Sequence, residues 1–310
     1  MTTFYESIMY YKLKSVNLVL KGGNPMDIGQ QNHHTKGSFS RRMFLKILGW
    51  LTLAGVFKKI TGVAHSQEKS DVLSESVRFE GKGGTLGGYL ARPSGKGPYP
   101  GVIVIHENRG VTDYIKEVTQ NIAKEGYVGL AVNLVSRSLG PDYPGGSDEA
   151  LNALGKLSDA EAMADLDAGV EYLKKQPVVF TNSIGCMGFC MGGRYSLLFA
   201  AHRKELKAAV VFYGRPINRI TPLQPKSPID VVPEMNAPLL GNFGEADPVI
   251  PVADVKKLEE ELTKNNKIYD IKIYPDAKHA FHREGPNYHA EAAKDSWKRV
   301  LIWFSKYLKT

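Results

Sequence analysis

Residues 183–202 read SIGCMGFCMGGRYSLLFAAH, and this stretch decides the fold. Its first residues have the apolar pattern of a buried strand, and the residues from Met191 onward have the pattern of a helix. Glycines stand two residues before Cys190 and two residues after it, so the chain has room for a tight turn at the junction. The pattern predicts that the Cys190 side chain projects above a sheet, at the N-terminus of a helix.

The arrangement around Cys190 is that of a nucleophile elbow, the strand-to-helix turn of α/β-hydrolases. The positive end of the helix favours a thiolate over a thiol, which suits a cysteine nucleophile. The backbone N–H of Met191 is expected to point to the place where an oxyanion forms. A buried cysteine at a glycine-rich turn would give the same motif, so this interpretation needs support from the rest of the chain. Cys186 lies inside the predicted strand among apolar neighbours and is expected in the core.

Away from the elbow, the chain alternates short apolar runs with amphipathic stretches. Residues 101–105, GVIVI, form a continuous run rich in β-branched side chains, which is typical of a buried parallel strand. Strands separated by helices predict an α/β-hydrolase fold with a mostly parallel central sheet and helices on both faces. We expect strands at 77–80, 87–91, 101–105, 127–133, 183–189, 206–213, 239–243 and 267–274, and helices at 111–125, 160–175, 191–202, 252–265 and 289–308.

Two segments between these elements, 134–158 and 214–236, have the composition of loops. The first is rich in Gly, Pro and Ser, and the second is rich in Pro. We expect both to overlie the carboxyl edge of the sheet, because open α/β sheets place their functional sites there.

A nucleophile needs a base, and the base needs an acid that orients it. In α/β-hydrolases the chain order is nucleophile, acid, histidine. Downstream of Cys190, Asp247 follows a predicted strand, and His279 lies in the loop before the last predicted helix. Glu245 is an alternative acid and His282 an alternative base. The agreement of three positions in the required order makes Cys190, Asp247 and His279 the predicted triad.

The strand at 101–105 ends in His106-Glu107-Asn108. In α/β-hydrolases the loop after this strand supplies the second oxyanion N–H, which here belongs to Asn108. Glu107 is expected beside the cysteine nucleophile, where its carboxylate would accept a hydrogen bond from the resting thiol.

Four motifs together resemble the dienelactone hydrolase family, from Ser76 to the C-terminus. They are IHE at 105–107, GFCMGG at 188–193, GEADPVIP at 244–251 and YPDAKHAF at 274–281. Because all four occur in the family's order and spacing, the resemblance is specific. It implies a triad of Cys190, Asp247 and His279, a resting-state glutamate at Glu107, and oxyanion donors in the backbones of Asn108 and Met191.

The same resemblance implies an activity. Family members hydrolyse the ester bond of enol-lactones that carry a carboxylate, and one arginine that holds this carboxylate corresponds to Arg283. Their second carboxylate-binding arginine has no matching position in residues 134–158, although Arg137 lies there. We therefore expect a small-molecule ester or lactone as the substrate and a thiol-acyl intermediate in the reaction.

Two other functional classes stay open at this point. One is a binding protein that keeps the fold but has lost turnover, against which the intact triad argues. The other is a redox thiol protein that uses Cys186 and Cys190, although a pair with one member inside a strand meets disulfide geometry poorly. The sequence contains no metal-ligand cluster, phosphate-binding loop or dinucleotide fingerprint, so we expect neither a metal nor another cofactor.

The positive charge of the protein is concentrated near its N-terminus. The net charge is +8, and residues 1–70 hold 10 Lys and Arg against 3 Asp and Glu, whereas the remaining 240 residues hold 30 against 29. A nucleic-acid partner would need a basic patch on a folded face. The nearly neutral remainder argues against such a partner.

The basic N-terminal segment resembles a twin-arginine signal peptide. Arg41 and Arg42 precede Met-Phe-Leu-Lys and a weakly apolar run at 47–57. This run is too short to span a bilayer as a helix, which needs about 20 apolar residues. Small residues at Ala64 and Ser66 fit a signal peptidase site. A basic leader for the general secretory route and a surface helix are the alternatives.

This interpretation divides the chain into an N-terminal extension with the signal peptide (1–66), a linker (67–75) and an α/β-hydrolase domain (76–310). It implies transient contact with the twin-arginine export machinery, a periplasmic or secreted mature protein, and no membrane span after cleavage. Either Met1 or Met26 is the start of translation. With only two cysteines the domain has no disulfide framework, which suits a route that carries folded proteins.

Overall fold

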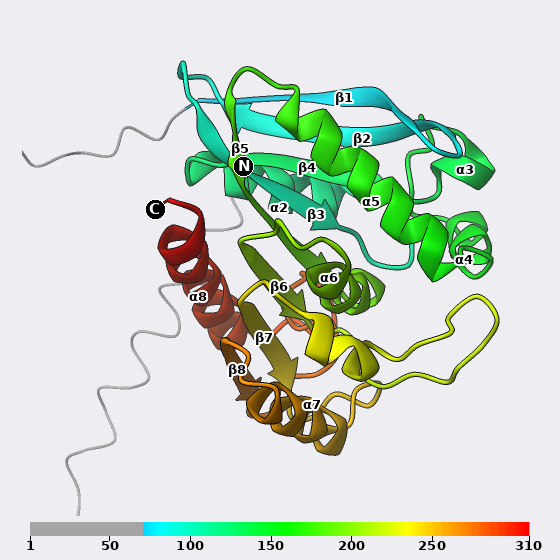
Figure 1. Ribbon diagram of the computed structural model, residues 1–310, viewed down its shortest axis with the longest axis vertical. Coiled ribbons are helices and arrows are strands. Elements are labelled where there is room, and N and C mark those ends of the chain that lie inside the picture. The colour runs from blue at the N-terminus through cyan, green and yellow to red at the C-terminus, as the bar shows by residue number, and fades with distance from the viewer. Residues whose placement is uncertain (1–70, 310) are drawn as a thin grey trace, which may run out of the picture. The chain divides into compact units, whose positions relative to one another are not determined.

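The computed structural model of the protein describes residues 71–309, and its centre is an eight-stranded sheet in the order β1-β2-β4-β3-β5-β6-β7-β8 (Figure 1). Strands β3 to β8 are parallel, whereas β1 and β2 form an antiparallel hairpin at one edge, with β2 antiparallel to β4. This is the predicted α/β-hydrolase fold. The strands are β1 (Val72–Gly81), β2 (Gly84–Pro93), β3 (Tyr99–Ile105), β4 (Val128–Asn133), β5 (Val179–Phe189), β6 (Ala208–Phe212), β7 (Leu239–Gly244) and β8 (Tyr269–Tyr274).

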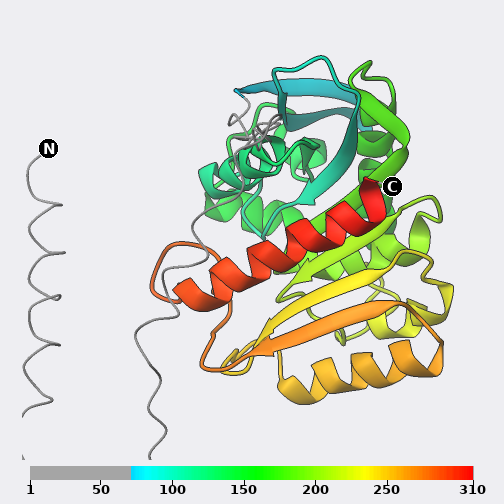
Figure 2. The ribbon, with the colours of Figure 1, turned by 90° about the vertical axis from the view of Figure 1, so that its left-hand side faces the viewer.

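Helices cover both faces of the sheet, as predicted. Side chains of α5, α6 and α7 share one hydrophobic core with the sheet, and those of α2 and α8 share the other. Helix α8 crosses β5, β6 and β7 (Figure 2). The helices are α2 (Asp113–Lys124), α3 (Ser136–Leu139), α4 (Asp148–Leu154), α5 (Asp159–Lys174), α6 (Met191–His202), α7 (Val252–Lys264) and α8 (Ala290–Leu308), with a 3₁₀ helix η1 (Pro228–Glu234).

Strand β3 shows why both faces are covered. Val102 and Val104 face the core of α2 and α8, while Ile103 and Ile105 face the other core, and none of the four is exposed. Successive side chains of a strand point to opposite faces, so a continuous apolar run requires cover on both sides.

Some element boundaries differ from the prediction. β1 begins at Val72, inside the segment expected to be a linker, and Phe79 is its one buried residue. The apolar alternation that reveals a strand therefore covers only part of β1. The predicted loop at 134–158 contains α3 and α4. The Ser147 hydroxyl caps α4 by accepting from two backbone N–H groups of its first turn, and so short a helix gives no amphipathic pattern.

The segments expected over the carboxyl edge lie there. Helices α3 and α4 project beyond the ends of the parallel strands, and so does the loop between β6 and η1 (Figure 1). These segments surround the strand ends that carry the predicted site residues.

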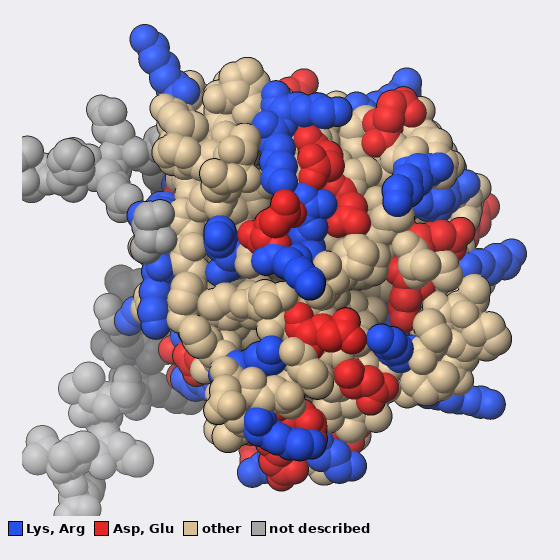
Figure 3. Space-filling view, viewed as in Figure 1, with Lys and Arg blue, Asp and Glu red and all other residues tan. Residues whose placement is uncertain are grey.

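The surface of the described part carries both signs of charge. Lys and Arg alternate with Asp and Glu over the face in Figure 3, in agreement with the near neutrality of the chain after residue 70. Within residues 71–309, every helix is too short or too polar to cross a bilayer.

Candidate active site

The turn between β5 and α6 places Cys190 at the N-terminus of α6 with a φ of 54° and a ψ of −114°. Such a conformation costs a residue other than glycine of order 1–3 kcal/mol. The Cys190 N–H donates to the carbonyl oxygen of Phe212 at 3.0 Å, which ties the turn to β6. The flanking glycines are required by space, because a Cβ on Gly188 would lie 2.0 Å from the Gly192 oxygen and one on Gly192 would lie 2.2 Å from the Ile105 oxygen. The predicted elbow is present.

Two loops bring a histidine and an aspartate to Cys190. His279 Nε2 lies 3.1 Å from Cys190 Sγ, and His279 Nδ1 lies 2.8 Å from Asp247 Oδ2. Asp247 is buried, and its Oδ1 accepts from the backbone N–H groups of Val249 and Ile250 at 2.7 and 3.1 Å. These bonds hold the carboxylate in place. The structure thus joins the three predicted residues, which are far apart in the chain, in one hydrogen-bonded row; their catalytic roles stay predictions.

The alternative acid and base lie outside this row. Glu245 shares a loop with Asp247, but its side chain is exposed. His282 packs among aromatic rings, and its Nδ1 lies 2.9 Å from the Tyr114 hydroxyl. Burial lowers the pKa of His282 to about 4, so this ring is neutral at neutral pH. The geometry favours Asp247 and His279 over both alternatives.

The surroundings of His279 favour its protonated form. Burial lowers its pKa, but the hydrogen bonds with Asp247 and Cys190 and the negative charges of these groups outweigh burial and raise the pKa to about 9. The ring of Tyr213 packs against the imidazole with 5.1 Å between the centroids. The imidazole can therefore hold a proton beside a thiolate or exchange it with the thiol.

A second charged pair borders the row. Arg283 Nη1 donates to Glu107 Oε2 at 3.0 Å, and the side chains of Arg283 and Glu107 are 46% and 10% exposed. Burial raises the pKa of Glu107, and the positive charges of Arg283 and His279 oppose that rise. In this structure the Glu107 carboxylate pairs with Arg283 and the thiol pairs with His279. The expected bond between Glu107 and the thiol stays a prediction.

The two expected oxyanion donors follow neighbouring strands. β3 and β5 pair in parallel with Ile105 opposite Gly188, and Asn108 and Met191 each come three residues later. Within the part of the chain that the structure describes, neither of these backbone N–H groups donates to a protein acceptor. Both are free to bind a ligand, and their role in catalysis stays a prediction.

Two further residues from the sequence analysis lie outside the site. Cys186 is fully buried in β5, as expected, and burial raises the pKa of its thiol to about 12. Arg137 in α3 donates to both carboxylate oxygens of Asp165, at distances of 2.6 to 3.0 Å. The Asp165 side chain is fully buried. Arg137 therefore belongs to a structural ion pair.

Residues 86–308, which contain every residue of this site, match the sequence profile of the Dienelactone hydrolase family. The protein belongs to this family. It is therefore a hydrolase, and the resemblance seen in the four motifs is confirmed.

Several dienelactone hydrolase relatives match most of the chain. A candidate carboxymethylenebutenolidase from Methylorubrum extorquens is 37% identical over 242 residues, which cover 77% of this chain and 83% of that protein. A candidate 2-oxo-3-(5-oxofuran-2-ylidene)propanoate lactonase from Bradyrhizobium is 35% identical over 222 residues, which cover 71% and 89%. The crystal structure of a candidate dienelactone hydrolase from Klebsiella pneumoniae superposes with a TM-score of 0.72 at 34% identity, over 76% of this chain and 100% of that one.

Two aromatic residues beside the candidate site were not found from the sequence. Tyr213 packs on His279, and Tyr114 reaches His282 from α2. Tyr213 could have been found, because it directly follows the buried run of β6 and the carboxyl ends of the parallel strands lie at the site. Tyr114 lies in an ordinary amphipathic helix and gives no such signal. Among residues 71–309, no group of three or more His, Cys, Asp or Glu side chains is arranged to hold a metal ion.

Proposed function

We propose that the protein hydrolyses a carboxylic ester or lactone through a thiol-acyl intermediate on Cys190. The observation that carries this proposal is the row Asp247–His279–Cys190, with distances of 2.8 and 3.1 Å, at a strained turn on a helix N-terminus. A nucleophile, a base and an orienting acid in hydrogen-bond contact are what acyl transfer needs. Membership of a hydrolase family gives the reaction class.

The first half of the proposed reaction acylates the cysteine. Asp247 accepts a hydrogen bond from the Nδ1–H of His279, so that Nε2 faces the sulfur and takes the thiol proton. The thiolate attacks the carbonyl carbon, and the oxyanion that forms receives hydrogen bonds from the N–H groups of Asn108 and Met191. When the intermediate collapses, the bond to the leaving oxygen breaks, and that oxygen takes the proton from His279. In a lactone, the leaving oxygen stays attached to the acyl group.

The second half releases the acid. A water molecule loses a proton to His279 Nε2 and attacks the thioester carbonyl, again with the oxyanion on the two backbone N–H groups. Collapse expels the Cys190 sulfur, which regains its proton. The pKa of about 9 for His279 supports this cycle, because the ring keeps its proton at neutral pH whenever the thiolate is present.

The two alternatives have less support. A redox role would pair Cys190 with Cys186, but the Cys186 thiol is fully buried in β5 and its raised pKa disfavours the thiolate. A binding protein without turnover would not need a buried acid that holds a histidine against a strained cysteine. We therefore place hydrolysis first and a silent binding protein second.

A substrate panel tests the function directly. Purified protein is expected to hydrolyse at least one class among thioesters, aryl esters and enol-lactones, and the Cys190→Ala variant is expected to hydrolyse none of them. The names of the relatives, with a butenolide or an oxofuranylidene propanoate as substrate, place carboxylated lactones first in the panel. Absence of turnover in the whole panel would support the binding protein instead.

Arg283 is expected to select anionic substrates. Its Nη1 holds Glu107 while nearly half of its side chain is exposed, so the remaining N–H groups can bind a substrate carboxylate. A hydrogen bond between charged groups contributes about 1.5–3 kcal/mol. Arg283→Ala should therefore raise KM for a carboxylated lactone on the order of tenfold to a hundredfold more than for a neutral aryl ester.

Removing Arg283 also leaves Glu107 without its partner, and any damage that this causes should affect both substrates. The KM for the neutral ester therefore measures that damage. Arg78→Ala is a matched control, since Arg78 pairs with Asp142 on the surface and should leave both KM values unchanged. Equal effects of Arg283→Ala on the two KM values would show that Arg283 does not distinguish an anionic substrate from a neutral one.

We also propose that the precursor is exported in a folded state and cut near Ser66. Arg41 and Arg42, on which this rests, lie outside the described residues. Replacing both with lysine should retain the protein in the cytoplasm, because a twin-arginine signal depends on the pair itself and not on its charge. Exchanging Lys58 and Lys59 for arginine is the control and should leave export intact. Export that persists in the Arg41→Lys/Arg42→Lys variant, or in cells without the twin-arginine pathway, would rule this route out.

A further inference from the structure

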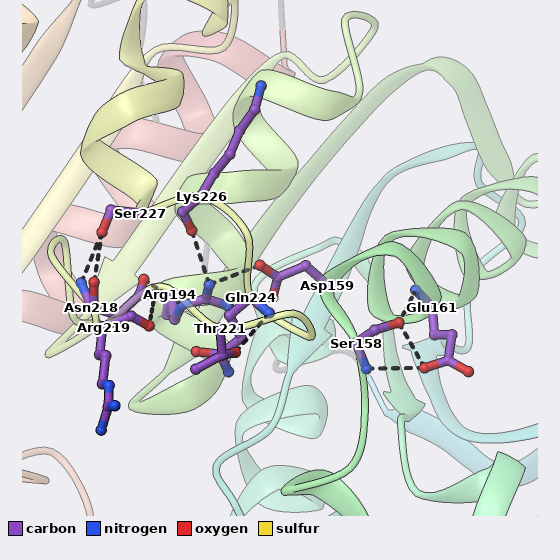
Figure 4. Close-up of polar contacts among 10 residues, drawn as sticks. All are labelled: Ser158, Asp159, Glu161, Arg194, Asn218, Arg219, Thr221, Gln224, Lys226 and Ser227. Atoms are coloured by element: carbon purple, nitrogen blue, oxygen red, sulfur yellow. Dashed lines mark hydrogen bonds and ion pairs between the residues drawn. The ribbon is translucent and has the colours of Figure 1, made fainter.

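A buried arginine links the nucleophile helix to two other parts of the chain. Arg194 lies four residues after Cys190 on α6 and is 5% exposed. Its Nη1 and Nη2 donate to the two carboxylate oxygens of Asp159, at 2.6 and 2.9 Å. Its Nε donates to Asn218 Oδ1 at 3.0 Å, and Nη2 also donates to the Lys226 carbonyl oxygen at 3.4 Å. Figure 4 shows these contacts converging on one guanidinium.

Arg194 and Asp159 contact residues 214–227, named here the 214–227 loop, at three places. Asn218 lies on its outgoing arm and Lys226 on its returning arm. Near the tip, the carbonyl oxygen of Leu223 accepts from the backbone N–H of Asp159 at 2.9 Å. The two arms of the loop are thus bound by the Arg194 side chain and the tip by the backbone of Asp159, and we call this pair of residues the clamp.

Further bonds close the 214–227 loop on itself. The Ser227 hydroxyl donates to the Asn218 carbonyl oxygen and accepts from the Asn218 N–H, both at 3.0 Å. Thr221 and Gln224 exchange backbone hydrogen bonds at 3.0 Å (Figure 4). The loop is thus a compact unit closed by its own hydrogen bonds.

The 214–227 loop leaves the sheet directly at the site. Tyr213, the residue before it, packs on the imidazole of His279. Gly214 lies against Gly193 in the first turn of α6, where a Cβ on Gly214 would lie 2.2 Å from the Gly193 carbonyl carbon. The first residue of the loop therefore lies against the nucleophile helix, and the residue before the loop lies against the base.

We propose that Arg194 is a positioning residue and that the 214–227 loop it holds is a specificity-determining wall of the site. A buried ion pair contributes little net stability, because desolvation offsets the attraction between the charges. The planar fork of an arginine, however, fixes the directions of its hydrogen bonds. The clamp therefore acts mainly on the position of the loop. This inference rests on the proposed ester hydrolysis.

The test compares two aryl esters that differ only in acyl length, an acetate and an octanoate. Asn218→Ala removes a loop contact and leaves the ion pair intact. Arg194→Met/Asp159→Leu replaces the whole pair with apolar side chains, so that no buried charge is left alone. We expect both variants to shift the octanoate-to-acetate ratio of kcat/KM, mainly through KM, on the order of tenfold. Iodoacetamide does not depend on the 214–227 loop for binding, so the rate at which it alkylates Cys190 should stay at the wild-type value.

Arg203→Met is the matched control. Arg203 lies at the other end of α6 and pairs with Asp167 and Glu205 at 3.2 and 2.6 Å, with 16% of its side chain exposed. Loss of these pairs lowers stability without touching the loop, so the ratio should stay at the wild-type value. A purely structural role of Arg194 would give the same result, a lower Tm with an unchanged ratio.

Hydrogen exchange of the amides in residues 214–227 gives a second readout that does not depend on activity. The inference holds if these amides exchange faster in both clamp variants and the ester ratio shifts. It is overturned if the wild type is active and the variants keep the wild-type ratio, whatever their exchange rates. If the wild type hydrolyses neither ester, the proposed function fails on its own, and unchanged exchange in the variants would still overturn the clamp.

Discussion

Replacing Cys190 or His279 with alanine is expected to lower kcat for ester hydrolysis by a factor on the order of 10⁴ to 10⁶, with the fold intact. The reason is the contact between the two groups at 3.1 Å, in which one supplies the electron pair and the other moves the proton. The double variant should be almost as active as either single variant, because residues that act as a unit are strongly non-additive. The measurement is kcat on the best ester of the panel, with thermal unfolding to verify the fold.

Two controls sharpen this prediction. Cys186→Ala removes the other sulfur, which is fully buried in β5, and should cost some stability but little activity. Asp247→Asn keeps the shape of the acid but offers His279 a wrong hydrogen-bonding partner, so a loss on the order of 10⁴ is expected. Additive losses in the Cys190→Ala/His279→Ala variant would mean that the two residues act in separate steps.

Cys190→Ser is expected to lose most activity, by roughly a hundredfold or more, even though the two side chains are nearly isosteric. A thiol ionises far more readily than an alcohol, and the helix N-terminus and a His279 ring with a pKa of about 9 both favour an anion on the sulfur. A serine hydroxyl would need His279 to act as a full general base while the oxygen attacks, because the hydroxyl does not ionise beforehand.

Comparison of kcat for the cysteine and serine enzymes across pH makes the second prediction sharper. The ratio of kcat for the serine variant to kcat for the wild type should increase as the pH rises, because the neutral form of His279 becomes more abundant. A serine variant that matches the wild type within a few-fold at neutral pH would show that the site is not arranged for a thiolate.

The part of the site that could be predicted from sequence is the part that local sterics and topology determine. The elbow requires glycines at fixed distances from Cys190, because backbone atoms approach there within the space of a Cβ. In a parallel sheet the loops after successive strands gather at one edge, so Asp247 and His279 could be placed from strand order alone. Neither inference needed any knowledge of side-chain packing.

The contacts that could not be predicted join loops whose approach only the folded chain reveals. Glu107 follows β3 and Arg283 precedes α8, and no sequence pattern pairs them. The bond between Arg194 and Asp159 joins α6 to the start of α5, and in the sequence each looks like a surface charge. β1 was found only in part because most of its side chains are exposed.

The most direct test of the central claim is to trap the acyl-enzyme. Protein mixed with an activated ester and quenched in acid within the first turnover should carry one acyl group, and peptide mass spectrometry should locate it on the peptide with Cys190. Prior treatment with iodoacetamide should place the alkyl group on the same sulfur and abolish both acylation and turnover. An acyl group on any other residue, or full turnover after complete alkylation of Cys190, would contradict a thiol-acyl mechanism in this protein.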